Sequence, residues 1–159
     1  MEESLQYEVA TFAAGCFWDA EAEFRLWEGV IGTMTGYSGG FVPEPGYEQV
    51  SSGTTGHAEA VQVIFDPERV SYDHLLDLFW SIHDPFLEQE DRTRSAIFYH
   101  SPEQKAIAEA SRDRLQRSTG RTILTEIRPF EKLWKAEECH QQYYEKCGQG
   151  YCTSTKYWE

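Results

Sequence analysis

The sequence lacks any apolar stretch long enough to cross a membrane, and its first residues, Met1-Glu2-Glu3-Ser4, carry no basic side chain. A membrane-spanning helix needs about 20 consecutive apolar residues, and a secretory signal begins with a basic segment. These two absences predict a protein that neither enters a membrane nor is exported. We therefore expect it in the cytoplasm.

Positive charge and cysteine are also scarce. Lys and Arg number 14 against 27 Asp and Glu, which gives a formal net charge of -13 and argues against binding to nucleic acids or to anionic membranes. Four cysteines without a signal peptide indicate catalytic, redox or metal-binding roles and not a disulfide scaffold. The chain also lacks linkers, repeats and low-complexity tracts, so we expect a single domain over residues 1–159.

What the sequence does contain is an interleaved set of strand-like and helix-like segments. Alternating apolar residues predict strands over 7–14, 30–37, 58–65, 94–99 and 122–127. Helical spacing and N-cap residues predict helices after Cys16, after Ser71, after Ser101 with Ile107 facing inward, and over 136–146. Residues 41–56 should form an ordered loop. This pattern favours an α+β sandwich in which a sheet packs on two helices.

The segment Gly15-Cys16-Phe17-Trp18 lies where the first strand gives way to the first helix. The positive end of a helix dipole favours a thiolate over a thiol, and the two aromatic side chains can form an apolar cradle beside the sulfur. Gly15 allows the backbone or a substrate to approach closely. Buried cysteines are nevertheless common and inert, so these residues alone leave a reactive and a structural role open.

This segment continues as GCFWDAE, and it is followed in order by several further motifs that cover nearly the whole chain. These are GYSGG at 36–40, PGYEQV at 45–50, TGHAEAVQV at 55–63, FDPERVSYDHLLDLFWSIHDP at 65–85, RSAIFY at 94–99 and AEECHQQYYEK at 136–146. Together they resemble the A-type methionine sulfoxide reductases, which reduce the S epimer of methionine sulfoxide in proteins. GCFW and TGHAE are the specific motifs of this resemblance.

The resemblance implies a ferredoxin-like split βαβ sandwich with an irregular C-terminal extension, and a role for each motif. Cys16 matches the nucleophile that becomes a sulfenic acid, and Glu59 matches the proton donor, which must be buried to stay protonated near neutral pH. Tyr47 matches the tyrosine that binds the sulfoxide oxygen. Phe17 and Trp18 match the pocket for the methyl group of the substrate.

The resemblance also implies how Cys16 is regenerated. Cys152, in a flexible tail over 147–159, matches the resolving cysteine that forms an intramolecular disulfide, and Cys147 is an alternative or second relay thiol. Thioredoxin or another dithiol would reduce that disulfide. We expect Cys139 to be a packed core cysteine. We expect a monomer with no bound cofactor and no metal, whose partners are thioredoxin and oxidised proteins.

The sequence departs from the family at two places. Asp19 replaces a glycine and brings a negative charge within one turn of Cys16, although it also suits an ordinary first helical turn. The loop before Arg94 is short, and Thr93 stands where the family has a second oxygen-binding tyrosine. Asp91 is the best substitute for the aspartate of the family, with Glu90 next to it.

Two other functions are compatible with parts of the sequence. His57 and Glu59 would point to the same face of a regular strand, so a cysteine hydrolase using both with Cys16 is possible. A metal-stabilised binding module could use Cys139, His140, Cys147 and Cys152, although their spacing contains no paired zinc knuckle.

Overall fold

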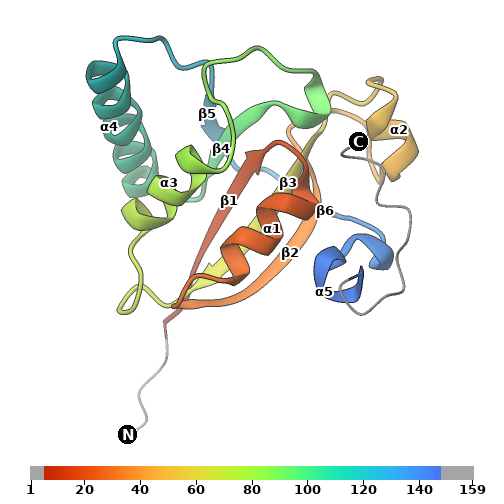
Figure 1. The fold of residues 1–159 in the computed structure, drawn as a ribbon. Helices are drawn as coiled ribbons and strands as arrows, with labels where there is room; N and C mark the ends of the chain where they lie inside the picture. The colour runs from red at the N-terminus through yellow and green to blue at the C-terminus, as the bar shows by residue number, and fades with distance from the viewer. Residues whose placement is uncertain (1–5, 148–159) are drawn as a thin grey trace, which may run out of the picture.

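The computed structural model describes residues 6–147, and its centre is one mixed sheet of six strands in the order β5-β4-β1-β3-β2-β6. Figure 1 shows the three central strands crossing the middle of the molecule. All neighbouring strands are antiparallel except β4 and β5. The strands are β1 (Glu8–Ala14), β2 (Val30–Ser38), β3 (Ala58–Phe65), β4 (Ser95–Tyr99), β5 (Glu126–Pro129) and β6 (Trp134–Lys135).

The helices pack mainly on one side of this sheet. Figure 1 shows α1 lying across the central strands, with α3 and α4 beside it. Helix α4 contacts α3 as well as strands β4 and β5. The helices are α1 (Phe17–Arg25), α2 (Tyr47–Ser51), α3 (Tyr72–Ser81), α4 (Pro102–Thr119) and α5 (Tyr143–Cys147), with 3-10 turns η1 (Asp91–Thr93) and η2 (Glu138–His140). None of the helices within residues 6–147 has the length and hydrophobicity of a membrane span.

The predicted split βαβ sandwich is confirmed by the strand order. Strand β3 pairs antiparallel with both β1 and β2, so β1 and β2 are parallel to each other with β3 inserted between them. Helix α1 connects β1 to β2, and α3 connects β3 to β4. This arrangement places the C-terminal ends of β1 and β2 beside the N-terminal end of β3, where Glu59 pairs with Tyr37.

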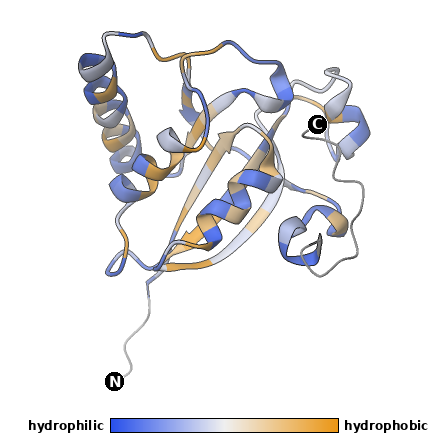
Figure 2. Cartoon of the chain, viewed as in Figure 1, coloured by the Kyte–Doolittle hydropathy of each residue, from blue (hydrophilic) through white to orange (hydrophobic). Residues whose placement is uncertain are grey.

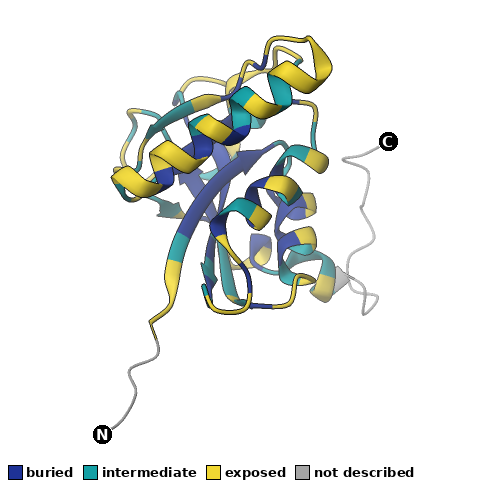
Figure 3. Ribbon diagram, turned by 90° about the vertical axis from the view of Figure 1, so that its left-hand side faces the viewer, coloured by how far each residue is buried: buried dark blue, intermediate teal, exposed yellow. Residues whose placement is uncertain are grey.

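The core lies between the sheet and the helices. Phe12 stacks on Phe24 of α1 at 5.1 Å and contacts Phe79 of α3 at 5.2 Å between ring centroids. Burial of such aromatic side chains is the main stabilising contribution. Figure 3 shows that β1 is buried while the outer side of α4 is exposed, and Figure 2 shows hydrophobic residues along the central strands.

The N-cap predicted at Ser101 of α4 is confirmed, and Ser71 caps α3, the helix predicted after it, in the same way. The hydroxyl oxygens of Ser71 and Ser101 accept hydrogen bonds from the amides of His74 and Gln104, each at 3.1 Å.

The structure corrects four other expectations. The loop 41–56 contains helix α2, and the strand predicted over 122–127 is observed at Glu126–Pro129. Ile107 is 36% exposed instead of inward-facing. The helix predicted over 136–146 is divided into η2 and α5, because Gln142 has a left-handed φ of 48°.

Candidate active site

Cys16 is the N-cap residue of α1 and follows directly after the end of β1. Gly15 makes the turn between them with a φ of 86°, a left-handed conformation that only glycine adopts without a steric penalty. The carbonyl oxygen of Cys16 accepts the hydrogen bond from the amide of Ala20, at 3.1 Å, that opens the helix. The predicted position of Cys16 at the start of the first helix is confirmed.

The surroundings of the Cys16 sulfur favour the thiol over the thiolate. Burial, and next the negative charge of Glu59, raise the pKa of the Cys16 thiol to about 12. The amides of Trp18 and Asp19 at the helix N-terminus lower this pKa, as the sequence predicted, but the carboxylate of Asp19 adds a further small increase. Desolvation of the thiolate therefore outweighs the effect of the helix N-terminus on this pKa.

Glu59 is a buried carboxyl group next to Cys16. Its side chain is 2% exposed, and Oε1 accepts a hydrogen bond from the Phe17 amide at 3.1 Å. On its other side, Nη1 of Arg92 donates to Oε2 at 3.4 Å. Burial raises the pKa of Glu59 to about 7, although the Phe17 amide and Arg92 both act to lower it. Glu59 can therefore hold and release a proton near neutral pH.

Aromatic rings surround the two residues that follow Cys16. Phe17 and Trp18 are buried, and the ring of Tyr47 lies 6.3 Å from that of Phe17 and 6.2 Å from that of Trp18. Burial, and next the charge of Glu59, raise the pKa of Tyr47, so its side chain is an uncharged phenol. The structure thus brings Cys16, Glu59, Tyr47, Phe17 and Trp18 together, as the sequence predicted.

His140 fixes the orientation of Trp18, a role that the sequence analysis, which named His140 only as a possible metal ligand, did not identify. Nε1 of Trp18 donates a hydrogen bond to Nδ1 of His140 at 3.0 Å, and the ring of Tyr143 stacks on that of Trp18 with their centroids 3.7 Å apart. His140 also stacks on Tyr47 at 4.4 Å. Burial lowers the pKa of His140, which keeps Nδ1 available as an acceptor. The only sequence signal was the AEECHQQYYEK motif.

Glu137 holds the two tyrosines of the site in place. Its Oε1 accepts a hydrogen bond from the Tyr37 hydroxyl at 2.8 Å, and its Oε2 accepts one from the Tyr47 amide at 3.0 Å. Tyr37 is fully buried and its ring lies 5.6 Å from that of Phe17. Glu137 therefore couples helix α2 to the end of β2. Neither Glu137 nor Tyr37 was predicted, because they join positions 100 residues apart.

The short loop before β4 contributes Arg92 to the site. Asp91, the predicted substitute for the family aspartate, is exposed at the start of η1. In this loop, the side chain that pairs with Glu59 is that of the neighbouring Arg92. The carboxylate of Asp91 is thus outside the cluster that the other predicted residues form, and sequence reasoning overlooked the arginine beside it.

The structure gives less information about the other three cysteines. Cys147 is the last residue of α5, and Cys152, with the rest of the predicted tail, lies outside residues 6–147. Cys139 is exposed at η2, so the expectation that it packs in the core is wrong. The helix predicted over 136–146 is divided there, so Cys139 lies in the short 3-10 turn η2 and not on the apolar face of a longer helix.

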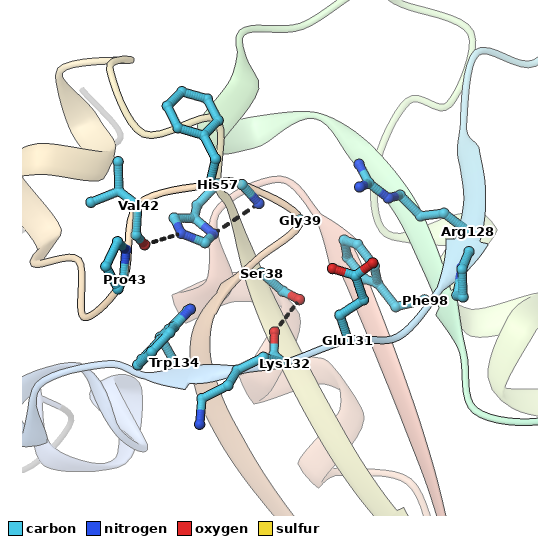
Figure 4. A pocket seen from close by; sticks show the side chains of 13 residues that line it. Ser38, Gly39, Val42, Pro43, His57, Phe98, Arg128, Glu131, Lys132 and Trp134 are labelled. Carbon is cyan, nitrogen blue, oxygen red and sulfur yellow. Dashed lines mark hydrogen bonds between the residues drawn. The ribbon is translucent and has the colours of Figure 1, made fainter.

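His57 is separated from Cys16 and Glu59. Its Nδ1 accepts a hydrogen bond from the Gly40 amide at 3.0 Å, and its Nε2 pairs with the Val42 carbonyl at 2.8 Å. Figure 4 shows this ring at a cavity of about 380 Å³ that Phe98 also lines. Both ring nitrogens are occupied in holding a loop, and β3 begins only at Ala58. The strand alternation assumed for a cysteine hydrolase therefore does not apply.

The metal-binding alternative is not supported by the described part of the chain. Within residues 6–147, no three His, Cys, Asp or Glu side chains lie close enough together to hold a metal ion. His140, one of the residues proposed as a ligand, uses Nδ1 to accept a hydrogen bond from Trp18.

A buried carboxyl group beside a cysteine at a helix N-terminus, on a split βαβ sheet, defines a thiol-based oxidoreductase site. Comparison with known proteins identifies the kind. The family model described as peptide methionine sulfoxide reductase matches residues 8–158. The MsrA of Geobacter sulfurreducens is 52% identical over 96% of this chain and 99% of its own length, and that of Methanosarcina mazei is 54% identical over 89% and 71%.

Solved structures agree. Reduced Mxr1 from Saccharomyces cerevisiae superposes with a TM-score of 0.86 at 29% identity, covering 96% of this chain and 92% of that one. Methionine sulfoxide reductase A of Corynebacterium diphtheriae gives 0.80 at 32% identity over 93% and 78%. Mxr1 in complex with Trx2 gives 0.65 at 27% identity over 90% and 88%. The chain belongs to the peptide methionine sulfoxide reductase family, and its activity is that of a peptide-methionine (S)-S-oxide reductase.

Proposed function

We propose that Cys16 attacks the sulfur of methionine sulfoxide while Glu59 supplies a proton to the sulfoxide oxygen. The observation that supports this most directly is the 3.1 Å hydrogen bond from the Phe17 amide to Glu59. It fixes a buried carboxyl group, with a pKa of about 7, next to the residue that follows the nucleophile. Oxide is a very poor leaving group, so the oxygen must be protonated as the sulfur–sulfur bond forms.

The reaction balances without a cofactor. The Cys16 sulfur bonds to the substrate sulfur, the protonated oxygen moves to Cys16, and the sulfur–sulfur bond breaks. The thiol proton of Cys16 replaces the one that Glu59 gave up. Cys16 thiol plus methionine sulfoxide thus gives Cys16 sulfenic acid plus methionine, with two electrons passing from the cysteine sulfur to the methionine sulfur.

The two sides of the site should hold different parts of the substrate. The phenol of Tyr47 can donate a hydrogen bond to the sulfoxide oxygen, as an oxyanion-hole donor would. Phe17 and Trp18 offer apolar ring surface for the methyl group, and contacts of this kind contribute about 0.3–1.5 kcal/mol each. The 3.0 Å bond from Trp18 to His140 would keep the indole in a fixed orientation for this role.

We expect the two epimers to differ strongly in rate, and Trp18→Ala to weaken that difference. Exchanging the methyl group and the oxygen would place the oxygen against hydrocarbon, which costs about 1–3 kcal/mol, so the R epimer should react about 5- to 150-fold more slowly. Enlarging the methyl pocket should reduce this ratio. The measurement is dithiol-dependent turnover on each pure epimer. Equal rates with the unaltered protein would contradict the pocket assignment.

We further propose that a second cysteine resolves the sulfenic acid. The thiol of Cys152 attacks the Cys16 sulfenic sulfur, water leaves, and an intramolecular disulfide forms. Cys147 is the alternative thiol. A disulfide requires the two Cα atoms to come within about 7 Å, so this step needs residues 147–159 to reach the start of α1. A dithiol protein then reduces the disulfide by exchange.

Thioredoxin is the reductant we propose. The complex of the related Mxr1 with Trx2 supports a thioredoxin partner. The remaining expectations, namely a monomer without bound cofactor in the cytoplasm that repairs oxidised proteins, stay predictions.

We expect Cys152→Ser to release one equivalent of methionine and then stop with thioredoxin, because the sulfenic acid on Cys16 has no partner. Small dithiols should restore part of the turnover. Mass spectrometry after one turnover should show Cys16 as sulfenic acid or its adduct. If this variant instead forms a Cys16–Cys147 disulfide and cycles normally with thioredoxin, Cys147 is the resolving residue.

A further inference from the structure

Arg92 forms an ion pair unlike the others in the described part of the chain. Its side chain is 34% exposed, but its partner Glu59 is 2% exposed. By contrast, both members of the Arg114–Asp73 pair are about half exposed, at 54% and 48%. Exposed ion pairs such as Arg114–Asp73 contribute little to stability because water screens the two charges. Arg92 instead brings a positive charge from a surface loop to the buried carboxyl group of the active site.

The loop that carries Arg92 is held firmly by its neighbour Arg94. Nη1 of Arg94 donates hydrogen bonds to the carbonyls of Asp91 at 3.0 Å and Gly56 at 2.9 Å, and Nη2 donates to Gly39 at 3.4 Å. These bonds tie η1 to the end of β2 and the start of β3. Because Glu59 lies three residues after Gly56, the position of Arg92 relative to Glu59 is set by backbone contacts of the loop.

The guanidinium group of Arg92 also acts electrostatically on Tyr47 and has an unused donor. The positive charge of Arg92 acts to lower the pKa of Tyr47. Its Nε is buried and has no hydrogen-bond partner among residues 6–147. Buried donors are rarely left unpaired in proteins. A guanidinium with spare donor capacity therefore lies beside the carboxyl group that is proposed to protonate the sulfoxide oxygen.

Among residues 6–147, Arg92 is the one cationic side chain that forms an ion pair with Glu59. The other titratable groups that act on Glu59, or on which it acts, are neutral or acidic. They come from α1, β2 and α2, and they are Cys16, Asp19, Tyr37 and Tyr47. When Glu59 loses its proton, the groups within residues 6–147 that hydrogen-bond the resulting carboxylate are the Arg92 guanidinium and the Phe17 amide.

We propose that Arg92 is a positioning residue of the reductase step: its guanidinium orients the Glu59 carboxyl group and stabilises the carboxylate that remains once the proton has passed to the sulfoxide oxygen. This inference rests on the proposed acid role of Glu59. It also gives the shortened loop a function, because the loop that lacks the second tyrosine supplies a charge in its place. No atom is transferred to or from Arg92.

The test is the single-turnover release of methionine, without recycling reductant, measured as a function of pH. The variants are Arg92→Met, Arg92→Gln and Arg92→Lys, with Arg114→Met as a matched control for loss of an ion-paired arginine. In the unaltered protein the rate should fall as the pH rises through about 7, where Glu59 loses its proton. The control should reproduce this profile.

Without Arg92 the acid becomes weaker. For Arg92→Met and Arg92→Gln we expect the decrease in rate with rising pH to begin about one pH unit higher. Loss of a neighbouring positive charge typically raises the pKa of a carboxyl group by about this amount. At pH values below this decrease, each variant should react about 3- to 10-fold more slowly than the unaltered protein, because a weaker acid transfers its proton less readily. Arg92→Lys retains the charge and should keep the fall near its original pH. A merely structural role would lower the rate without moving the profile.

The inference is overturned if folded Arg92→Met and Arg92→Gln show a fall at the original or a lower pH. Glu59→Gln, measured in the same way, separates this failure from failure of the proposed function. If Glu59→Gln removes the fall but Arg92 variants leave it unmoved, only the role of Arg92 is wrong. If Glu59→Gln leaves the fall in place, the acid assignment itself is wrong.

Discussion

Cys16→Ser should abolish sulfoxide reduction while leaving the protein folded. A serine hydroxyl cannot take up the sulfoxide oxygen while giving two electrons to the substrate sulfur, so the loss should be on the order of 10⁴-fold or more, as for other nucleophile replacements. Serine is also a favourable N-cap residue, and the adjacent core residues Phe17 and Phe24 are unchanged. The measurement is dithiol-dependent release of methionine, together with a thermal unfolding curve.

The matched control is Cys139→Ser. Cys139 is exposed at η2, and its replacement should change neither turnover nor stability appreciably. Substantial turnover by a folded Cys16→Ser protein would remove Cys16 from the mechanism. Loss of activity in both variants would point instead to a role for Cys139 that the structure does not indicate.

Glu59→Gln should slow the single-turnover step by roughly 10²–10⁴-fold, the usual contribution of a general acid. Glutamine can still accept the hydrogen bond from the Phe17 amide, so the change removes the exchangeable proton and little else. The pKa of Glu59 is raised to about 7, so the acid is mostly protonated below that pH and mostly ionised above it. The rate of the unaltered protein should therefore fall as the pH rises through about 7, and the variant should not show this fall.

Glu21→Gln is the corresponding control, because Glu21 is a buried carboxyl group of α1 that accepts hydrogen bonds from Thr33 and Gln142. It should affect stability but keep the pH profile. The deficit of Glu59→Gln should shrink at low pH, where hydronium can protonate the oxygen. An unchanged rate and profile in Glu59→Gln would exclude Glu59 as the acid.

The parts of this fold that sequence predicted are those encoded locally. The alternation of Val61, Val63 and Phe65 defined β3 at the bounds that the structure shows. Ser71 and Ser101 marked the starts of two helices because their hydroxyls bond amides three residues away. Gly15 and Cys16 marked the strand-to-helix turn. Each of these signals depends on neighbouring residues, so a single sequence suffices to read it.

The parts that sequence missed depend on contacts between distant positions. Glu137 reaches Tyr37 and Tyr47, and Trp18 bonds a histidine 122 positions away. No spacing rule indicates such pairs. The protonation of Cys16 was missed for a related reason. The helix N-terminus is visible in the sequence, whereas the degree of burial and the approach of Glu59 appear only once β3 has packed beside α1.

The thiol state of Cys16 has a consequence for the oxidants that this protein meets. Hydrogen peroxide reacts with thiolates and very slowly with thiols, so a cysteine that burial and a carboxylate keep protonated resists it. Methionine sulfoxide forms where such oxidants act, and a standing thiolate would be consumed by them. In this site the sulfoxide brings the oxygen that Glu59 can protonate. We therefore expect Cys16 to be oxidised by the sulfoxide substrate in preference to peroxide.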